Sequence, residues 1–513
     1  EYGGRGGRFH GSTIPWIGPF FQSQSCDSGP MDRSLAPDRL ATLVGDFPRA
    51  PAYRGLREAL QELIGDGRIP LGIRLPSERA VTRALGVSRN TVTRAYADLV
   101  AAGFATARQG AGTYAAVPVD RRRAHDHALH AADTTQAMDG VIDLNCAAGG
   151  ATPGVAAAYA RAMVALPAYL AGDGYLPSGL PALRGLVAAG YAQRGLPTAP
   201  EQIVITSGAL SAIAIVARAL SRPGDRVMIE SPVYSNAIDA LRLGGGRLVS
   251  APMADPLGDD GWDLASIEAT LRQTAPRLAY LIPDFQNPTG FLMQDAQRAR
   301  YAAALHATRT VAIIDETLQS TCLSETPMPL PFAAHSSGAY TIGSASKLCW
   351  GGLRVGWIRA PREAADRIIA TRVQMDLGSS LFDQLVVAEM LGADTFLAVR
   401  REQLRQRRDA LAQALREHLP DWRFRLPDGG LTLWVRMPHG SATQLAADME
   451  RQGIHLAPGP VFSVEGGADT WLRIPYAKPE EQLVQAVRAM AETWSARPQE
   501  HTPHQRRAKR LIA

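Results

Sequence analysis

One stretch decides how this chain is interpreted, namely Ser344-Ala345-Ser346-Lys347-Leu348-Cys349-Trp350-Gly351-Gly352-Leu353-Arg354-Val355-Gly356-Trp357. Lys347 is one of only three lysines among 54 basic residues, and all the others are arginines. Because a guanidinium does not deprotonate in proteins, a lysine in so arginine-rich a chain indicates a need for a neutral amine. The commonest such need is a Schiff base. Small flanking residues and a following apolar run predict a buried turn, whereas a surface lysine is the plainer alternative.

Hydroxyl groups and a forked cation accompany this lysine. Ser344 and Ser346 precede it, and Arg354 follows seven residues later, a set that suits a phosphate dianion. The pattern Ser-x-Ser-Lys-x-x-x-x-Gly-Leu-Arg-x-Gly-Trp resembles the pyridoxal phosphate lysine motif of fold-type I aminotransferases. Together with the N-terminal motifs given below, residues 51–495 resemble the MocR/GabR branch of the GntR transcription regulators.

Length and composition predict two or three soluble globular domains, since 513 residues with 46% hydrophobic content exceed one domain. The four cysteines show neither disulfide nor metal spacing, and no apolar run reaches membrane-spanning length. We therefore expect a reduced, cytoplasmic protein without a metal or a membrane partner. The net charge is +5, and residues 51–116 hold nine Arg against five acidic residues, which favours a polyanionic partner there.

The chain divides into five expected segments. Residues 1–50 mix Gly, Pro and Ser without periodicity and predict a disordered extension, with an alternative start at Met31 left open. Residues 51–116 predict a DNA-binding domain, 117–140 a flexible linker, 141–495 an aminotransferase-like domain with a smaller C-terminal α+β subdomain, and 496–513 a basic disordered tail.

Residues 53–114 predict a winged helix-turn-helix of α+β class. Leu56, Leu60 and Ile64 share one helix face, Ser77 and Ser88 are N-caps of the next two helices, and residues 104–114 read as a two-stranded wing. A small helical interaction module with a solvated basic face is the alternative. The segment resembles the GntR-type DNA-binding domain over its full length.

This resemblance and the motif's docking geometry predict contacts with double-stranded promoter DNA from the second helix, the third helix and the wing. The candidate residues are Ser77, Glu78, Arg79, Ser88, Arg89, Asn90, Thr91, Thr93, Arg94, Arg108, Gln109 and Gly110.

From residue 142 onward, short apolar runs alternate with Ala/Leu-rich stretches, which predicts a parallel sheet with crossover helices. The strand at residues 202–206 feeds Ser207-Gly208-Ala209-Leu210, where exposed helix amides form an anion site. The apolar strand 311–315 ends in Asp315, a buried carboxylate that requires a partner.

The family resemblance implies a role for each candidate residue toward pyridoxal 5'-phosphate. Lys347 forms the Schiff base, Asp315 keeps the pyridine nitrogen protonated, Tyr234 stacks on the ring, Asn287 donates to the 3-oxygen, and Arg473 binds a substrate or effector carboxylate. The phosphate is held by Ser207, Gly208, Ala209, Leu210, Ser344, Ser346 and Arg354, and by Tyr175 from the neighbouring subunit of a homodimer.

Plainer interpretations remain open at two of these positions, because Asn287 sits in a turn sequence and a strand Arg such as Arg473 is often an ion-pair partner. One departure from the family pattern is Thr317, where a Tyr that bonds the 3-oxygen is common.

Three functions fit the sequence. The leading one is a transcription regulator whose aminotransferase-like domain senses an amine, an amino acid or pyridoxal phosphate through the Lys347 aldimine. The alternatives are an active aminotransferase with an appended DNA-binding domain, and a DNA-binding structural protein with a dead sensor fold, which the retained site residues disfavour. Asn236 stands where γ-aminobutyrate sensors carry an Arg, so an α-amino acid is the preferred effector. Whether transamination occurs is left open.

Overall fold

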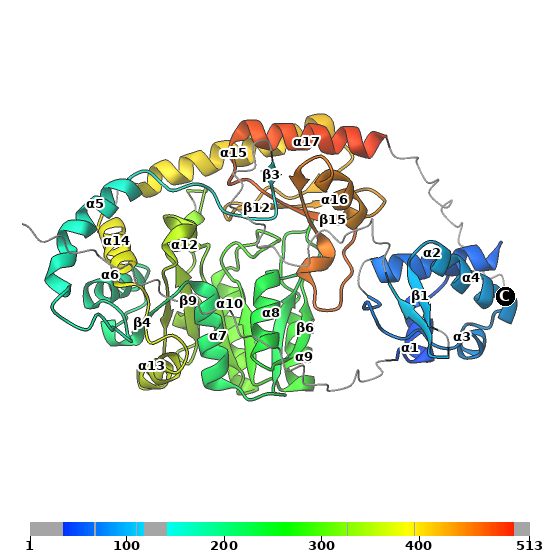
Figure 1. Cartoon of the computed structure of the whole chain (residues 1–513). Helices are drawn as coiled ribbons and strands as arrows, with labels where there is room; N and C mark the ends of the chain where they lie inside the picture. The colour runs from blue at the N-terminus through cyan, green and yellow to red at the C-terminus, as the bar shows by residue number, and fades with distance from the viewer. Residues whose placement is uncertain are drawn as a thin grey trace, which may run out of the picture.

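The computed structural model describes residues 34–65, 68–108, 110–116, 141–325, 327–393 and 396–496 (Figure 1). The predictions for a disordered extension over 1–33, a linker at 117–140 and a tail from 497 onward lie outside these residues.

The N-terminal unit is a winged helix-turn-helix, as predicted. Its elements are α1 (Pro37–Val44), α2 (Ala52–Gly65), α3 (Glu78–Leu85), α4 (Arg89–Ala101), β1 (Ala105–Arg108) and β2 (Gly112–Ala115). Ser77 caps α3 by accepting from the Ala80 amide, and Ser88 caps α4 by accepting from the Thr91 amide. Strands β1 and β2 pair antiparallel and form the wing.

Helix α1 corrects the expected boundary at residue 51, which was wrong for residues 34–50. Leu40 and Val44, one helical turn apart, are buried in the same hydrophobic core as α2 and α4. The Leu35 amide also donates to the Arg74 carbonyl at 2.9 Å. Pro37 in the first turn and Gly45 after the last are ordinary helix start and stop signals, so the sequence carried this information.

A seven-stranded sheet forms the centre of residues 141–393, in the order β4-β10-β9-β8-β7-β5-β6 (Figure 1). The strands are β4 (Ile203–Thr206), β5 (Arg226–Ser231), β6 (Arg247–Pro252), β7 (Leu278–Leu281), β8 (Val311–Asp315), β9 (Tyr340–Ser344) and β10 (Gly356–Arg359).

The expected all-parallel sheet is corrected at one strand, because β10 runs antiparallel to both β4 and β9. Only residues 345–355 connect β9 to β10, and a parallel crossover needs a dozen or more residues. This short connection contains the Lys347 motif.

Helices cover both faces of the sheet because alternate strand residues point to opposite sides. One face packs against α5 (Val155–Ala165), α6 (Pro181–Gln193), α9 (Leu264–Thr274), α10 (Asp295–Ala307), α11 (Phe332–His335) and α14 (Leu381–Leu391). The other face packs against α7 (Ala209–Leu220), α8 (Ser235–Leu243) and α13 (Ala365–Val373).

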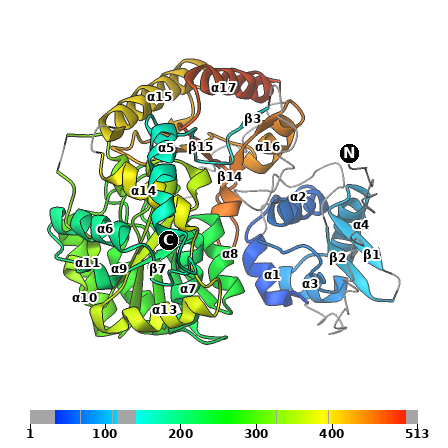
Figure 2. The same cartoon turned by 60° about the vertical axis from the view of Figure 1, so that its left-hand side comes forward.

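The C-terminal residues form the predicted smaller α+β subdomain. It contains α15 (Phe396–His418), α16 (Ala442–Glu450), α17 (Glu480–Ser495) and a sheet in the order β11 (Arg423–Phe424), β12 (Thr432–Arg436), β15 (Trp471–Pro475), β14 (Ala457–Pro458). Helices α15 and α17 lie side by side in both views (Figures 1 and 2). Strand β3 (Ile142–Asp143) joins this subdomain by pairing with β13 (Ile454–His455).

Within the described part of the chain, no helix has the length and apolar character needed to cross a membrane.

Candidate cofactor and DNA-binding sites

Lys347 lies on α12 (Ala345–Leu348), directly after β9. Its Nζ donates to the Ala147 carbonyl at 2.8 Å. Burial lowers the pKa of Lys347, and the nearby Arg473 and Arg354 charges lower it further, against the opposing effect of Asp315. A depressed pKa increases the fraction of neutral amine, which is the form that attacks a carbonyl.

The hydroxyl of Ser344 serves the turn that carries this lysine. Its Oγ accepts from the Ser346 amide at 3.1 Å and donates to the Val355 carbonyl at 3.4 Å. Ser344 is therefore the N-cap of α12 and orients Lys347 through the backbone.

The Arg354 side chain contacts the start of α7, where the sequence predicts the phosphate-binding residues. Its Nη2 donates to the Ser207 carbonyl at 3.4 Å, and its Nη1 donates to Ser346 Oγ at 3.5 Å. A Cβ at Gly208 would lie 2.6 Å from Arg354 Nη2, so only glycine leaves this approach open. The first amides of a helix have no partner within the helix, so the Arg354 guanidinium and the α7 N-terminus together suit an anion.

The remaining predicted phosphate residues are placed differently. The Ser207 hydroxyl contacts Ser379 Oγ at 3.1 Å and donates to Asp376 Oδ2 at 3.4 Å. Tyr175 is 62% exposed, and its amide donates to Asp173 Oδ1 at 3.0 Å within its own segment. A partner subunit is needed to give Tyr175 the predicted role.

Asp315 ends β8 with a buried carboxyl group that is hydrogen-bonded by Tyr280 and by Thr317. The Tyr280 hydroxyl donates to Oδ2 at 2.6 Å, and the Thr317 amide donates to Oδ1 at 2.9 Å. Burial raises the pKa of Asp315, while these bonds and the Lys347 charge lower it. Thr317 thus contributes both its backbone amide and its side chain to the hydrogen bonding of Asp315.

Asn287 and Tyr234 lie at the ends of the neighbouring strands β7 and β5. The Asn287 Oδ1 atom is buried and has no hydrogen-bond partner among the described residues. Burial raises the pKa of Tyr234 to about 12, and the charges of Arg473, Asp315 and Arg354 all act on it, which places Tyr234 in the same cluster as these groups.

Arg473 is fully buried on β15, where it packs over the Phe462 ring at 4.8 Å. Its Nη2 donates to the Asn145 carbonyl, and its Nε is a buried donor without a partner in the described chain. Burial lowers the pKa of Arg473 to about 10. A carboxylate would both satisfy the free donor and compensate the buried charge.

The sequence offered no signal for the segment 145–147, which follows β3. Its two outer carbonyls accept from two of the three cationic side chains of the site, Asn145 from Arg473 and Ala147 from Lys347. Tyr280 was also missed, although a tyrosine within the buried strand β7 needs a partner for its hydroxyl group.

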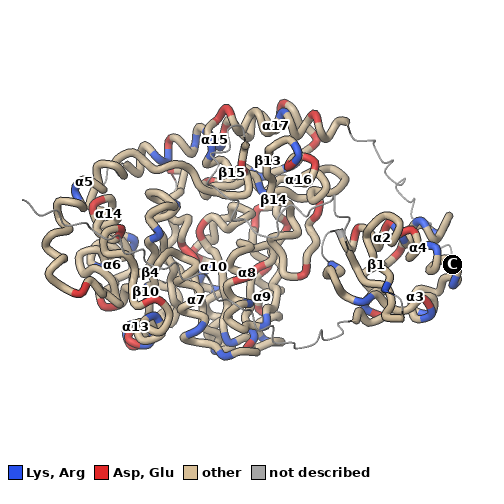
Figure 3. Tube along the Cα trace, viewed as in Figure 1, with Lys and Arg blue, Asp and Glu red and all other residues tan. Residues whose placement is uncertain are grey.

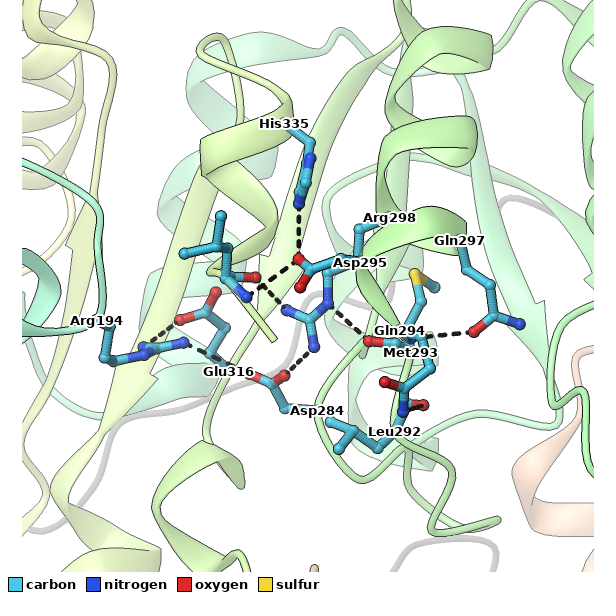
Figure 4. Close-up of polar contacts among 11 residues, drawn as sticks. Arg194, Asp284, Leu292, Met293, Gln294, Asp295, Gln297, Arg298, Glu316 and His335 are labelled. Atoms are coloured by element: carbon cyan, nitrogen blue, oxygen red, sulfur yellow. Dashed lines mark hydrogen bonds and ion pairs between the residues drawn. The ribbon is translucent and has the colours of Figure 1, made fainter. Parts of the chain in front are cut away.

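A buried ionic network lies behind the site (Figure 4). Arg194 Nη1 donates to Glu316 Oε2 at 2.8 Å, and Arg298 Nη2 donates to Asp284 Oδ1 at 2.6 Å. Arg194 Nη2 also lies 3.8 Å from Asp284 Oδ2. Asp284 follows β7 and Glu316 directly follows Asp315, so this network anchors the strand ends that carry the site.

The candidate DNA-binding residues lie on α3, α4 and the wing, and Figure 3 shows the Lys and Arg positions along these elements. Arg89 and Asn90 are exposed at the start of α4. Glu78 accepts from Thr93 Oγ1 at 2.7 Å and lies 3.7 Å from Arg89 Nε, so it positions α4 side chains. Arg94 stacks on Tyr53 at 3.8 Å and Arg108 on Tyr114 at 4.5 Å. Gln109 lies outside the described residues.

Comparison with known proteins divides the chain in the same way. Residues 52–115 match the model of bacterial regulatory proteins of the gntR family, and residues 171–490 match that of aminotransferase class I and II. The fold and the site thus define a class of protein in which a GntR-type helix-turn-helix is joined to an aminotransferase domain.

The chain belongs to the aminotransferase class I and II family, in the group with an N-terminal GntR-type domain that resembles MocR.

Three relatives illustrate this placement. The 2-aminoadipate transaminase of Thermus thermophilus is 31% identical over 62% of this chain and 79% of its own length. The HTH-type transcriptional regulator YdcR of Escherichia coli is 29% identical over 85% of this chain and 98% of its own length. The probable rhizopine catabolism regulatory protein MocR of Rhizobium meliloti is 29% identical over 80% of this chain and 86% of its own length.

A solved structure shares the aminotransferase part. The α-aminoadipate aminotransferase LysN of Thermus thermophilus, complexed with N-(5'-phosphopyridoxyl)-L-leucine, is 29% identical with a TM-score of 0.63. It covers 71% of this chain and 95% of its own. The predicted fold class and family resemblance are therefore confirmed.

Proposed function

We propose that this protein is a transcription regulator that binds promoter DNA through its winged helix and senses an amino acid through pyridoxal phosphate. The observation that carries the proposal is the joining of a GntR-type domain to a site that retains Lys347, Asp315, Arg354 and Arg473. Relatives matched over more than four fifths of this chain carry regulator names, whereas the transaminase relative matches 62% of it.

The residues present fit the cofactor. Asp315 supplies a carboxylate for the pyridine nitrogen, and Gly208 with Arg354 leaves a cradle for a phosphate. Pyridoxal phosphate, when bound, supplies an aldehyde carbon that can exchange the Lys347 amine for the primary amine of an effector. Lys347 would hold the cofactor through its amine, whose pKa is lowered by burial.

Segment 145–147 supports a switch at this site. Lys347 and Arg473 each donate to a carbonyl of this segment, and an α-amino acid presents an amine to the first and a carboxylate to the second. A carboxylate bound at Arg473 competes with the Asn145 carbonyl, and the released segment leads back toward residues 117–140 and the winged helix. A ligand that contacts one arrangement better than the other shifts the equilibrium between them.

We also propose a homodimer in which Tyr175 completes the phosphate site of its partner. Val164, Leu170 and Tyr175 are 82%, 69% and 62% exposed, and apolar side chains so exposed mark interaction surfaces. Sedimentation of the wild type and of Tyr175→Ala tests the dimer and the cofactor contact separately, because Tyr175→Ala should lower cofactor affinity more than it changes the mass.

The experiment that tests the proposed function follows the visible absorbance of the lysine-linked cofactor and the affinity for the protein's own promoter fragment in the same titration. Each α-amino acid is compared with the amine that lacks its carboxylate, and Lys347→Ala, which should lose the absorbance, is the control. We expect an amino acid to change both signals and its matching amine to act more weakly. Spectral change without any change in DNA affinity would refute sensing, and rapid keto-acid production would favour the aminotransferase alternative.

A further inference from the structure

Tyr280 lies beside the predicted ring-binding carboxylate. Strands β7 and β8 are parallel neighbours in which Tyr280 pairs with Ile313, so Tyr280 and Asp315 point to the same face of the sheet. The Tyr280 side chain is buried at 1% exposure, and its hydroxyl lies 2.6 Å from Asp315 Oδ2.

The direction of this hydrogen bond follows from the chemistry of both groups. An ionised carboxyl group only accepts, so the tyrosine must be the donor. Burial raises the pKa of Tyr280 well above its ordinary value, and the Asp315 charge raises it further, so its proton stays in place. The Thr317 amide donates to Oδ1 and the Thr317 side chain bonds the same carboxyl group, so Tyr280 acts together with Thr317 to favour the ionised form of Asp315.

We propose that Tyr280 is a positioning residue that keeps Asp315 ionised and aimed at the ring nitrogen of the bound cofactor. The inference rests on the proposed function only in requiring pyridoxal phosphate at this site. Removing the hydroxyl deletes a charge-assisted hydrogen bond while burial still favours the neutral acid, so Asp315 would lose its hold on the ring proton. A residue that merely filled the core would leave the protonation of the ring unchanged.

The matched change is Tyr280→Phe, which removes one oxygen from the buried ring. Tyr476→Phe is the control, because the Tyr476 hydroxyl is also buried but donates to the Gly429 carbonyl at 2.9 Å. Each full-length protein is loaded with pyridoxal phosphate labelled with ¹⁵N in the ring, and the ¹⁵N chemical shift is followed from pH 6 to 9.

We expect the ring nitrogen to stay protonated in the wild type and in Tyr476→Phe. In Tyr280→Phe the ring nitrogen should lose its proton at a pH lower by roughly one unit or more, within the measured range. Cofactor affinity should fall roughly tenfold. An unchanged pH profile in Tyr280→Phe would overturn the proposal. A wild type that binds no cofactor would instead refute the proposed function.

A double-mutant cycle tests whether Tyr280 acts through Asp315. Asp315→Asn removes the charge through which Tyr280 is proposed to act, so adding Tyr280→Phe should then cause no further loss of cofactor affinity. Equal losses in both backgrounds would show that Tyr280 acts independently of Asp315 and would overturn the proposal.

Discussion

Glu230 at the end of β5 should make the stability of this protein depend on pH. The carboxyl is buried at 1% exposure and accepts from Trp262 Nε1 at 2.7 Å, the Ile282 amide at 3.2 Å and Gln286 Nε2 at 3.3 Å. Burial outweighs these bonds and raises the pKa of Glu230 from 4.5 to about 7. Gln286 also holds the Thr289 amide, so this carboxyl supports the loop that carries Asn287.

The magnitude follows from linkage. A raised pKa in the folded state means that the folded protein binds a proton more tightly than the unfolded chain between pH 4.5 and about 7. The resulting stabilisation is fully present below pH 4.5 and is lost as the pH rises through about 7. At about 1.4 kcal/mol per pKa unit, the contribution is on the order of 3 kcal/mol.

Glu230→Gln removes this dependence, because an amide does not titrate. Hydrogen-bond donors surround this position, so the NH₂ group of the glutamine faces a donor and lowers the stability of the variant by an amount that does not change with pH. The informative quantity is therefore the difference in free energy of unfolding between variant and wild type, followed as a function of pH. We expect that difference to shift in favour of the variant by about 3 kcal/mol between pH 5 and pH 8.5.

Urea unfolding followed by tryptophan fluorescence measures this difference, since seven of the eight tryptophans lie within residues 141–496. Glu268→Gln is the control, because hydrogen bonding to Arg300 lowers the pKa of Glu268 and its charge is constant over this pH range. A difference for Glu230→Gln that stays constant from pH 5 to 8.5 would refute the reasoning.

Three further predictions concern the DNA surface, the phosphate cradle and the network behind the site. Arg89→Ala should weaken binding to the promoter fragment by about 1–3 kcal/mol, with little effect on nonspecific DNA, in a salt-controlled binding assay. Gly208→Ala should lower pyridoxal phosphate affinity about tenfold by displacing Arg354, whereas Gly338→Ala, where a Cβ meets open space, should not; equal affinities would contradict the phosphate assignment. Arg194→Ala should destabilise the fold by about 3–5 kcal/mol in urea unfolding, because Glu316 would lose its ion partner. Arg161→Ala, which breaks an exposed pair with Glu389, should cost about 1 kcal/mol or less, and similar losses for both arginines would argue against the buried network.

Local patterns in the sequence determined the two folded units and most of the candidate site. Ser77 and Ser88 cap helices through bonds that span three residues, and apolar periodicity sets which helix face is buried, so neither requires knowledge of the fold. Lys347, Asp315 and Gly208 were predicted for the same reason, because each sits in a short motif at the end of a strand. Residues 34–50 were misjudged although the start signal Pro37 and the stop signal Gly45 were visible in the sequence, so the error lay in the interpretation.

Only the tertiary structure decided how distant segments meet. The Tyr280–Asp315 bond joins residues 35 positions apart, the Lys347–Ala147 bond 200 positions and the Arg473–Asn145 bond 328 positions. The pairing of β10 with β4 likewise joins strands that lie far apart in the chain. Such contacts arise from sheet order and from the packing of the C-terminal subdomain, which no local periodicity encodes, because a sequence window contains only one partner of each pair.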